Sequence, residues 1–597
     1  MPRPRSTQEL IHWLEMGRGA GAIRLAATVL AIAVLSVVVA WKQFHGVTSE
    51  AALVQADVGR QIAGGEGFTT LVNYPQAAAF LQSRGHAFDA QHPYPELYQA
   101  PLYSVVIAAA LRLLPGDFRA SLFAEAPVPP DGFRGDYFLL GLNLILLWLA
   151  AGVTFALARR LFDPRVAWAS VLALLLSVGI WQQTVVAGGA PLLMLLAVVT
   201  FWIWTRVEET VDQVPRRALT GMAALGGGCG LLFLTEYAAG SLILVALVYA
   251  AVRFPRFRRL HALVMVTVGF LFVSGPWLGR NIALTGHPVA LAAQNGALKA
   301  GDPTAEPSDV RRTFAADQAE VDLNKLANKT LTGLQESLKE RIWSGGALWL
   351  AGFFVAGWLY AFRSPVANRM RWVVTAALGV MILAQAGFNS GESERLVTGW
   401  LAPLIIVFGT GFFSVLLTSN AALSQWPRLS VAGLLVVQAL PLVHDALEPR
   451  RLHFQYPPYF PSLFMGMRAD LEHRDTVGRF GVMADVPAGV AWYSGQRVWA
   501  QPVRLRDFYA ITLEQPMGEL LLTPRTLDRP FFSELAARPV EPGALKPVTE
   551  LFGDWGQIYA GLFTGRLPAD FPLSAPQKLA ENLYVLLNPA LPPAPGK

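Results

Sequence analysis

Residues 136–158 read DYFLLGLNLILLWLAAGVTFALA, and two arginines, Arg159 and Arg160, follow this run directly. Its length and composition predict a helix that crosses a membrane, because a hydrocarbon core of about 30 Å needs about 20 apolar residues in a helix. Similar runs recur between short basic clusters up to about residue 444. None of them alternates with a period of two, so we expect helices rather than the strands of a closed barrel.

The composition of the whole chain agrees with this interpretation. Of its 597 residues, 53% are hydrophobic and only 15% are charged, and the mean hydropathy is +0.40. The pI near 9.4 does not indicate nucleic-acid binding, because the excess basic residues flank the apolar runs, which is typical of membrane orientation. We therefore expect no nucleic acid among the partners. The single cysteine, Cys229, excludes a disulfide framework.

We predict an all-α polytopic membrane domain with about eleven spans. The first run is longer than a signal-peptide core and lacks a small-x-small cleavage site before Lys42, so it is expected to remain as an anchor. Residues 1–22 are expected to form a cytoplasmic amphipathic segment. The predicted spans cover residues 23–41, 136–158, 166–184, 188–205, 218–235, 238–253, 262–279, 342–362, 372–388, 399–417 and 429–444.

The positions of the arginines predict the orientation of these spans. If the N-terminus is cytoplasmic, the cytoplasmic segments carry eighteen arginines, whereas the three short loops on the other face carry one, Arg395. Such an asymmetry follows the positive-inside rule. The long segments 42–135 and 280–341 and the C-terminal residues 445–597 then lie on the outer side.

The outer segments are predicted to carry structure of their own. Residues 102–114 are apolar but too short to span, so we expect an interfacial helix there. We expect residues 23–444 to form the membrane domain and residues 445–597 a small α/β domain, in which Asp485 caps a helix. Its predicted strands are residues 481–484, 496–500, 519–522 and 583–587.

Charged and polar residues near the outer ends of the spans are the candidates for a site, because charge at a membrane interface is costly and is usually kept for a function. These candidates are Glu50, Asp57, Arg60, His92, Glu96, Tyr98, Glu236, Arg280, Glu394 and Arg395. Structural roles stay open for them, such as an i,i+3 pair of Asp57 and Arg60 or a membrane anchor at Arg280. No His/Asp/Glu cluster has the spacing of metal ligands, so no metal site is predicted, and a divalent-metal requirement is left open.

Four motifs give the chain a resemblance to a known family. They are GRQIAGGEGFTT at 59–70, PELYQAPLYS at 95–104, ARRLFDPRVAWAS at 158–170 and GPWLGRN at 275–281 with TGHP at 285–288. In this order, within residues 1 to about 410, they resemble the GT-C superfamily of membrane glycosyltransferases, especially bacterial relatives of protein O-mannosyltransferases and lipid A aminoarabinose transferases. The stretch ADVPAGVAWYSGQRVWAQP at 484–502 is similar to outer domains of some bacterial members.

The resemblance implies transfer of a sugar from a polyprenyl-phosphate donor to a lipid, glycan or protein acceptor, with inversion, at the periplasmic face of a bacterial inner membrane. The family's catalytic aspartate corresponds to Ala51, so the base is assigned to the neighbouring Glu50, with Asp57 as the alternative. Relatives commonly carry a basic residue near Glu236, so Arg280 or Arg395 is expected to bind the donor phosphate. Arg60, His92, Glu96, Tyr98 and Glu394 are the further substrate-binding candidates.

Two functions from other classes remain open beside the enzyme. One is a transporter or flippase of lipid-linked sugar, although the sequence shows no internal repeat with matched broken helices. The other is an inactive scaffold whose outer domain binds a partner. Membrane lipids are expected to surround the protein in each case.

Overall fold

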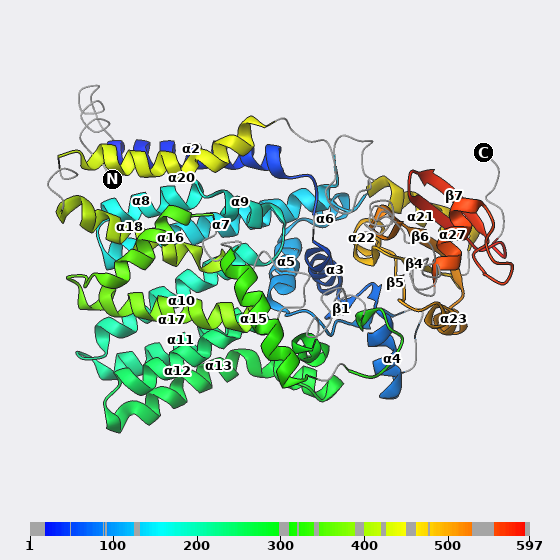
Figure 1. Ribbon diagram of the computed structural model, residues 1–597, viewed down its shortest axis with the longest axis horizontal. Helices are drawn as coiled ribbons and strands as arrows, with labels where there is room; N and C mark the ends of the chain where they lie inside the picture. The colour runs from blue at the N-terminus through cyan, green and yellow to red at the C-terminus, as the bar shows by residue number, and fades with distance from the viewer. Residues whose placement is uncertain are drawn as a thin grey trace, which may run out of the picture.

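The computed structural model describes residues 18–47, 49–86, 89, 92–124, 132–297, 310–318, 321–339, 346–388, 399–419, 425–448, 461–475, 478–527 and 555–591. Long helices lie side by side along the longest axis of the molecule, and shorter helices and strands gather at one end of them (Figure 1). We call this the outer end.

Eight helices within the described residues are long and apolar enough to cross a membrane. They are α2 (Arg18–Gln43), α7 (Arg134–Leu161), α10 (Ala190–Thr210), α11 (Pro215–Thr235), α13 (Arg256–Thr285), α17 (Pro365–Phe388), α18 (Ala402–Ser419) with η5 (Gly399–Leu401), and α20 (Pro427–Leu447). The chain is therefore a multi-pass membrane protein.

The three remaining predicted spans also correspond to apolar helices. The pair α8 (Pro164–Leu175) and α9 (Val178–Val185) passes the same test together but is bent by 55°. The other two predicted spans, 238–253 and 342–362, coincide with two shorter apolar helices. These are η1 (Tyr237–Ser241) with α12 (Leu242–Arg253), and α16 (Leu348–Ala356) with η4 (Gly357–Leu359). The predicted N-terminal amphipathic segment lies almost wholly outside the described residues.

Glycines bring α11 and α13 into backbone contact. A Cβ atom at Gly226 would lie 2.0 Å from the carbonyl oxygen of Val266, and one at Gly269 would lie 2.0 Å from that of Ala223. Small residues allow such close approach, which strengthens van der Waals packing where lipid offers no hydrophobic driving force between helices.

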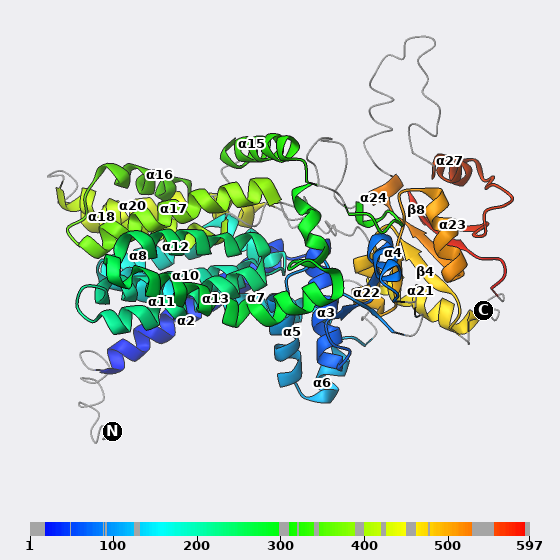
Figure 2. The same cartoon turned by 90° about the horizontal axis from the view of Figure 1, so that it is seen from below.

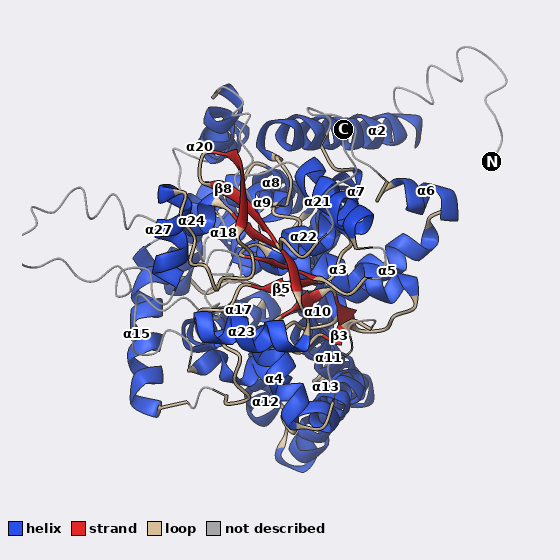
Figure 3. Cartoon of the chain, turned by 90° about the vertical axis from the view of Figure 1, so that its right-hand side faces the viewer, coloured by secondary structure: helices blue, strands red, loops and turns tan. Residues whose placement is uncertain are grey.

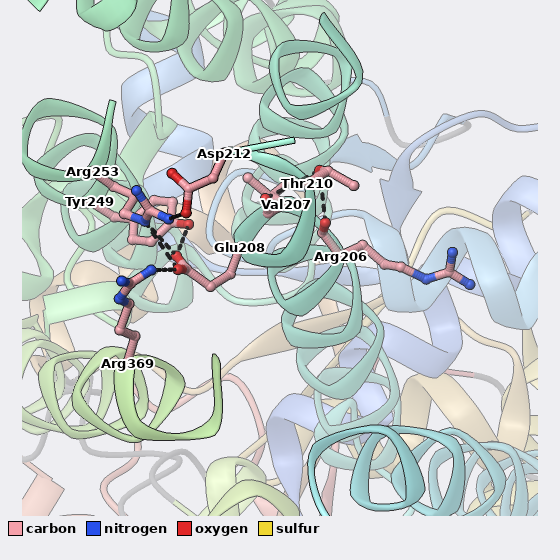
Figure 4. A network of polar contacts seen from close by, with 8 residues as sticks. All are labelled: Arg206, Val207, Glu208, Thr210, Asp212, Tyr249, Arg253 and Arg369. Carbon is pink, nitrogen blue, oxygen red and sulfur yellow. Dashed lines mark hydrogen bonds and ion pairs between the residues drawn. The ribbon is translucent and has the colours of Figure 1, made fainter. Parts of the chain in front are cut away.

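An ionic network joins three helices at the end of the bundle opposite the outer end (Figure 4). Glu208 of α10 has a completely buried side chain, and it accepts hydrogen bonds from Tyr249 at 2.6 Å, from Arg253 at 3.0 Å and from Arg369. Arg253 also pairs with Asp212. Arg253 and Arg369, both predicted to be cytoplasmic, therefore meet at one end of the bundle.

The first outer segment folds against the end of this bundle. Its elements are α3 (Glu50–Gly64), β1 (Thr69–Thr70), β2 (Val72–Asn73), α4 (Pro75–Ser83), β3 (Tyr94–Pro95), α5 (Leu102–Leu113) and α6 (Gly116–Ser121). Ser49 caps α3 by accepting from the N–H of Ala52, and Gly65, at φ 100°, ends it. The short helix α5 confirms the helix predicted over 102–114. The second outer segment contains η2 (Ala290–Gly296) and α15 (Leu323–Lys339), which lies beside the bundle (Figure 2).

A six-stranded sheet with the order β2-β5-β4-β6-β8-β7 forms the core of the outer end. Helices surround the strands (Figure 3). The C-terminal residues contribute β4 (Gly481–Ala484), β5 (Val498–Ala500), β6 (Met517–Leu522), β7 (Ala575–Ala580) and β8 (Leu583–Leu587), with helices α21 (Pro461–Arg474), α22 (Pro487–Ser494), α23 (Leu505–Glu514), α24 (Pro524–Leu527) and α27 (Gly556–Thr564). The four predicted strands are confirmed, with small differences in length.

The predicted helix cap at Asp485 is wrong. Val486 occupies the N-cap position of α22 without a side-chain cap. Instead, Oδ2 of Asp485 accepts hydrogen bonds from the N–H and the hydroxyl of Thr523, both at 2.9 Å. The carboxylate thus joins the ends of two neighbouring strands, which local sequence could not reveal.

The outer sheet is completed by a strand from the first outer segment. β2 pairs in parallel with β5, so that Val72 lies opposite Val498. Asp136 of α7 adds a second connection, because it accepts from Trp492 Nε1 at 2.8 Å and from the Tyr493 hydroxyl at 2.9 Å. The C-terminal residues are therefore fixed both to the first outer segment and to a membrane helix.

Candidate functional site

Glu96 and Arg280 lie where the first outer segment meets the outer end of α13. A small antiparallel ribbon, in which Thr70 of β1 lies opposite Tyr94 of β3, crosses this region. The N–H of Glu96 donates to the carbonyl of Phe68 at 3.2 Å and continues the ribbon by one step. This ribbon positions the residues on either side of it.

Arg280 places a positive charge at the outer end of α13. Its guanidinium donates to the carbonyls of Glu96 at 3.2 Å and Phe68 at 3.3 Å, and to Asn281 Oδ1 at 3.0 Å. It also lies 4.5 Å from the ring centroid of Trp277 and 5.2 Å from that of Phe68. Among the described residues it makes no ion pair with a carboxylate, although the charge of Glu96 acts on it.

Glu96, whose carbonyl accepts from Arg280, is 1% exposed. Its Oε1 accepts from the N–H groups of Tyr98 at 2.7 Å and Gln99 at 3.0 Å. Its Oε2 is buried and has no hydrogen-bond partner among the described residues. Burial raises the pKa of this carboxyl above its ordinary value, although the two backbone donors and the arginines Arg311 and Arg280 oppose the rise.

Glu50 begins α3 and is held by residues from three parts of the chain. Its Oε2 accepts from Arg525 of α24 at 2.5 Å, and its Oε1 accepts from the Tyr74 hydroxyl at 3.4 Å. Burial alone would raise the pKa of Glu50, but Arg525, with Arg312 and Arg311 farther away, holds the pKa below its ordinary value. The carboxylate is therefore ionised at neutral pH.

Arg311 connects these two carboxylates. It is 2% exposed, its guanidinium lies 4.6 Å from the ring centroid of Tyr98, and its charge acts on both Glu50 and Glu96. The Tyr98 hydroxyl donates to Gln76 at 3.2 Å. Sequence reasoning missed Arg311, because it lies in an outer segment 261 positions after Glu50, and only folding brings them together.

Asp57 has a different setting from Glu50, although both belong to α3. Its side chain is completely buried, and its Oδ2 accepts from the Thr70 hydroxyl at 2.9 Å and the Leu71 N–H at 2.7 Å. Burial raises its pKa, against the effect of these donors. These contacts suit a residue that holds β1 against α3, so Glu50 is the better candidate for the base.

The other candidates fall into three places. Arg60 and His92 line a polar cleft. Glu236 follows α11 directly, and burial raises its pKa to about 7; the hydroxyl of the next residue, Tyr237, accepts from Trp277 Nε1 at 2.9 Å. Glu394 and Arg395 lie outside the described residues. Within the described ranges, no group of three or more metal-ligand side chains occurs.

Comparison with known proteins identifies the architecture. No family model and no curated protein matches the sequence. Among solved structures, the Archaeoglobus fulgidus oligosaccharyltransferase, in a complex with zinc and sulfate, matches at a TM-score of 0.53 and 12% identity over 86% of this chain and 70% of that chain.

A second solved structure gives a weaker match. ArnT from Cupriavidus metallidurans, bound to undecaprenyl phosphate, has a TM-score of 0.49 and 14% identity over 87% of this chain and 95% of that chain. The oligosaccharyltransferase is the match that supports the assignment. The protein is thus a multi-pass membrane protein with a fold similar to that of the Archaeoglobus fulgidus oligosaccharyltransferase.

Proposed function

We propose that this protein transfers a glycosyl group from a polyprenyl-phosphate donor to an acceptor at the outer membrane surface, with Glu50 as general base and Arg280 as a ligand of the donor phosphate. The observation that carries the proposal is the setting of Arg280. A guanidinium at the outer end of a span, without a carboxylate partner among the described residues, suits a lipid phosphate at the membrane surface.

The chemistry requires a base and a charge stabiliser. The acceptor oxygen attacks the anomeric carbon while Glu50 takes the proton of the acceptor hydroxyl. The bond between the anomeric carbon and the phosphate oxygen breaks, and its electron pair leaves with the polyprenyl phosphate. The leaving phosphate gains negative charge in the transition state, which is where a fixed guanidinium stabilises it. Attack opposite the leaving group inverts the anomeric centre.

The proposal also includes the membrane in which the protein lies and its orientation there. The outer end is periplasmic, the N-terminus is cytoplasmic and the membrane is a bacterial inner membrane. The arginine asymmetry between the two ends of the spans supports this orientation. The acceptor is a lipid, glycan or protein, and the donor is lipid-linked.

Turnover of a lipid-linked sugar by the purified full chain in lipid nanodiscs tests the proposal. We expect Arg280→Gln to raise the KM for the donor about tenfold or more, since a charged hydrogen bond is lost, and Glu50→Gln to lower kcat about a hundredfold or more. Arg566→Gln removes an exposed charge at the outer end and serves as the matched control. Wild-type kinetics in both site variants would refute the assignment, and a donor that is bound or moved but never consumed would favour a scaffold or a transporter.

A further inference from the structure

A polar cleft lies between the first outer segment and the C-terminal residues. It has a volume of about 360 Å³, and its lining includes Arg60, Glu66 and His92 from the first outer segment and Gly495 and Arg497 from the C-terminal residues. The lining holds two arginines and one carboxylate, and His92 is exposed and pairs with Asp89 beside the cleft. The lining residues by themselves therefore carry more positive than negative charge, although Asp89 also acts on Arg497.

Arg60 is built into the wall of this cleft. Its Nη1 donates to the carbonyl of Trp492 at 3.3 Å, and the guanidinium lies 4.2 Å from the ring centroid of Phe123. Asp57, one turn earlier on α3, directs its buried oxygen to Thr70 and Leu71. Within the described residues Arg60 makes no ion pair, so most of its donors remain for a ligand.

Gly495 makes room for this guanidinium. It ends α22 at φ 68°, and a Cβ atom there would lie 2.9 Å from Nη2 of Arg60 and 3.1 Å from Nη1. Any other residue would be strained at this φ and would push against the arginine. The backbone of the C-terminal residues thus closes directly onto the Arg60 side chain.

Neighbouring cations leave the cleft short of negative charge. Burial lowers the pKa of Arg60, and the positive charge of Arg468 lowers it further against the effect of Asp57. Burial also lowers the pKa of Arg497, which donates from Nη1 to the carbonyl of Asp89 at 2.9 Å. An anion in the cleft would offset the positive charge that Arg468 places near Arg60.

We propose that this cleft binds the anionic group, a phosphate or a carboxylate, of a sugar acceptor. Two arginine forks recognise oxyanions by paired hydrogen bonds, and the volume exceeds what an inorganic ion needs, so it admits a sugar ring as well. The role of the cleft in supplying an acceptor rests on the proposed function, whereas the binding of an anionic sugar to the cleft is independent of that function.

The position of the cleft suits an acceptor rather than the donor. Leu71 follows β1 and His92 precedes β3, so in this antiparallel ribbon both stand at one end, whereas Phe68 and Glu96 at the other end contact Arg280. The ribbon therefore separates the His92 side of the cleft from the proposed phosphate ligand of the donor, and Glu66 lies on the Phe68 side. A sugar held here by its anion could extend a hydroxyl past the ribbon towards the transfer site.

Isothermal titration calorimetry with the purified full chain in nanodiscs tests this proposal, with glucose 1-phosphate, glucuronate, glucose and inorganic phosphate as probes. We expect at least one of the two anionic sugars to bind with a measurable Kd, and we expect glucose not to bind. Comparing the Kd of glucose 1-phosphate with that of glucuronate shows whether the cleft prefers a phosphate or a carboxylate. Arg60→Gln and Arg497→Gln should each weaken binding about tenfold or more. Arg479→Gln, which removes an exposed charge outside the cleft, should leave it unchanged.

The outcomes are separable. Failure of both anionic sugars to bind, or unchanged Kd values in both cleft variants, would overturn the proposal, and binding of inorganic phosphate alone would overturn the assignment to a sugar. Thermal unfolding of each variant checks that it is folded, and Arg497→Gln decides the matter if Arg60→Gln is not. Donor turnover in the same preparations reports the proposed function independently, because binding without turnover refutes only the transfer reaction.

Discussion

Removing Arg525 while keeping Glu50 gives the sharpest test of the site. Arg525 donates to Glu50 at 2.5 Å, and the two side chains are 26% and 12% exposed. Opposite charges about 4 Å apart attract by about 4 kcal/mol at an effective dielectric constant of about 20, which equals about 3 pKa units. Partial exposure screens this value, and Arg311 and Arg312 remain. We therefore expect Arg525→Gln to raise the pKa of Glu50.

The sign of the pH dependence follows from the lowered pKa. A carboxylate with a lowered folded-state pKa stabilises the fold above its unfolded-state pKa, and this contribution is lost as the pH falls through the folded-state pKa. With Arg525 replaced, the folded-state pKa rises towards the unfolded-state pKa, so the contribution becomes smaller and its loss is complete at a higher pH. If Glu50 is the base, the acid limb of donor turnover should also move to higher pH.

The assay is the pH profile of donor turnover in nanodiscs, measured beside thermal unfolding at each pH. Arg566→Gln should leave the acid limb in place, and Glu50→Gln should abolish the turnover to which the limb belongs. An Arg525→Gln profile that coincides with the wild-type profile would refute the role of Glu50 as the titrating base. A shift in stability without a shift in turnover would show that the ion pair only joins α3 to α24.

Three further substitutions test the contacts that hold the site in place. Asp57→Asn turns an acceptor of two buried hydrogen bonds into a mismatched amide, so the unfolding free energy should fall by about 1–3 kcal/mol, as thermal unfolding would reveal; no loss would mean that β1 is held by other contacts. Glu208→Gln leaves two arginines facing a neutral buried group and should cost about 3 kcal/mol, measured by chemical denaturation with Glu209→Gln as the control; equal stability of the two variants would contradict this account. Gly269→Val places a Cβ atom 2.0 Å from the Ala223 carbonyl and should separate α11 from α13, so a cross-link between cysteines introduced on the two helices should form more slowly; an unchanged rate would argue against the close packing.

Much of the fold could be predicted from local sequence. The apolar runs predicted every long membrane helix in the described residues, because span length is set by the thickness of the hydrocarbon and needs no knowledge of neighbours. The brevity of residues 102–114 predicted α5. The strands of the C-terminal residues were predicted because β-branched and apolar residues are bounded there by turn residues.

The candidate site could be predicted only in part. The sequence selected Glu50, Glu96 and Arg280 because they stand at outer ends of apolar runs, and the fold brings Arg280 to the backbone of Glu96. It could not tell Glu50, which an arginine holds ionised, from Asp57, which is buried under two hydrogen bonds, since both are simply acids on one helix. The difference arises from neighbours elsewhere in the chain.

The sequence alone determined which helices are long and apolar enough to cross a membrane, since hydrophobic length acts locally, and it predicted from the placement of the arginines which segments stand outside. Only the tertiary structure decided that β2 joins a sheet made by residues more than 400 positions later, that Arg525 holds Glu50, and that Arg60 faces Gly495. Contacts between such distant residues are selected by the packing of the whole outer end, and no local pattern of residues encodes them.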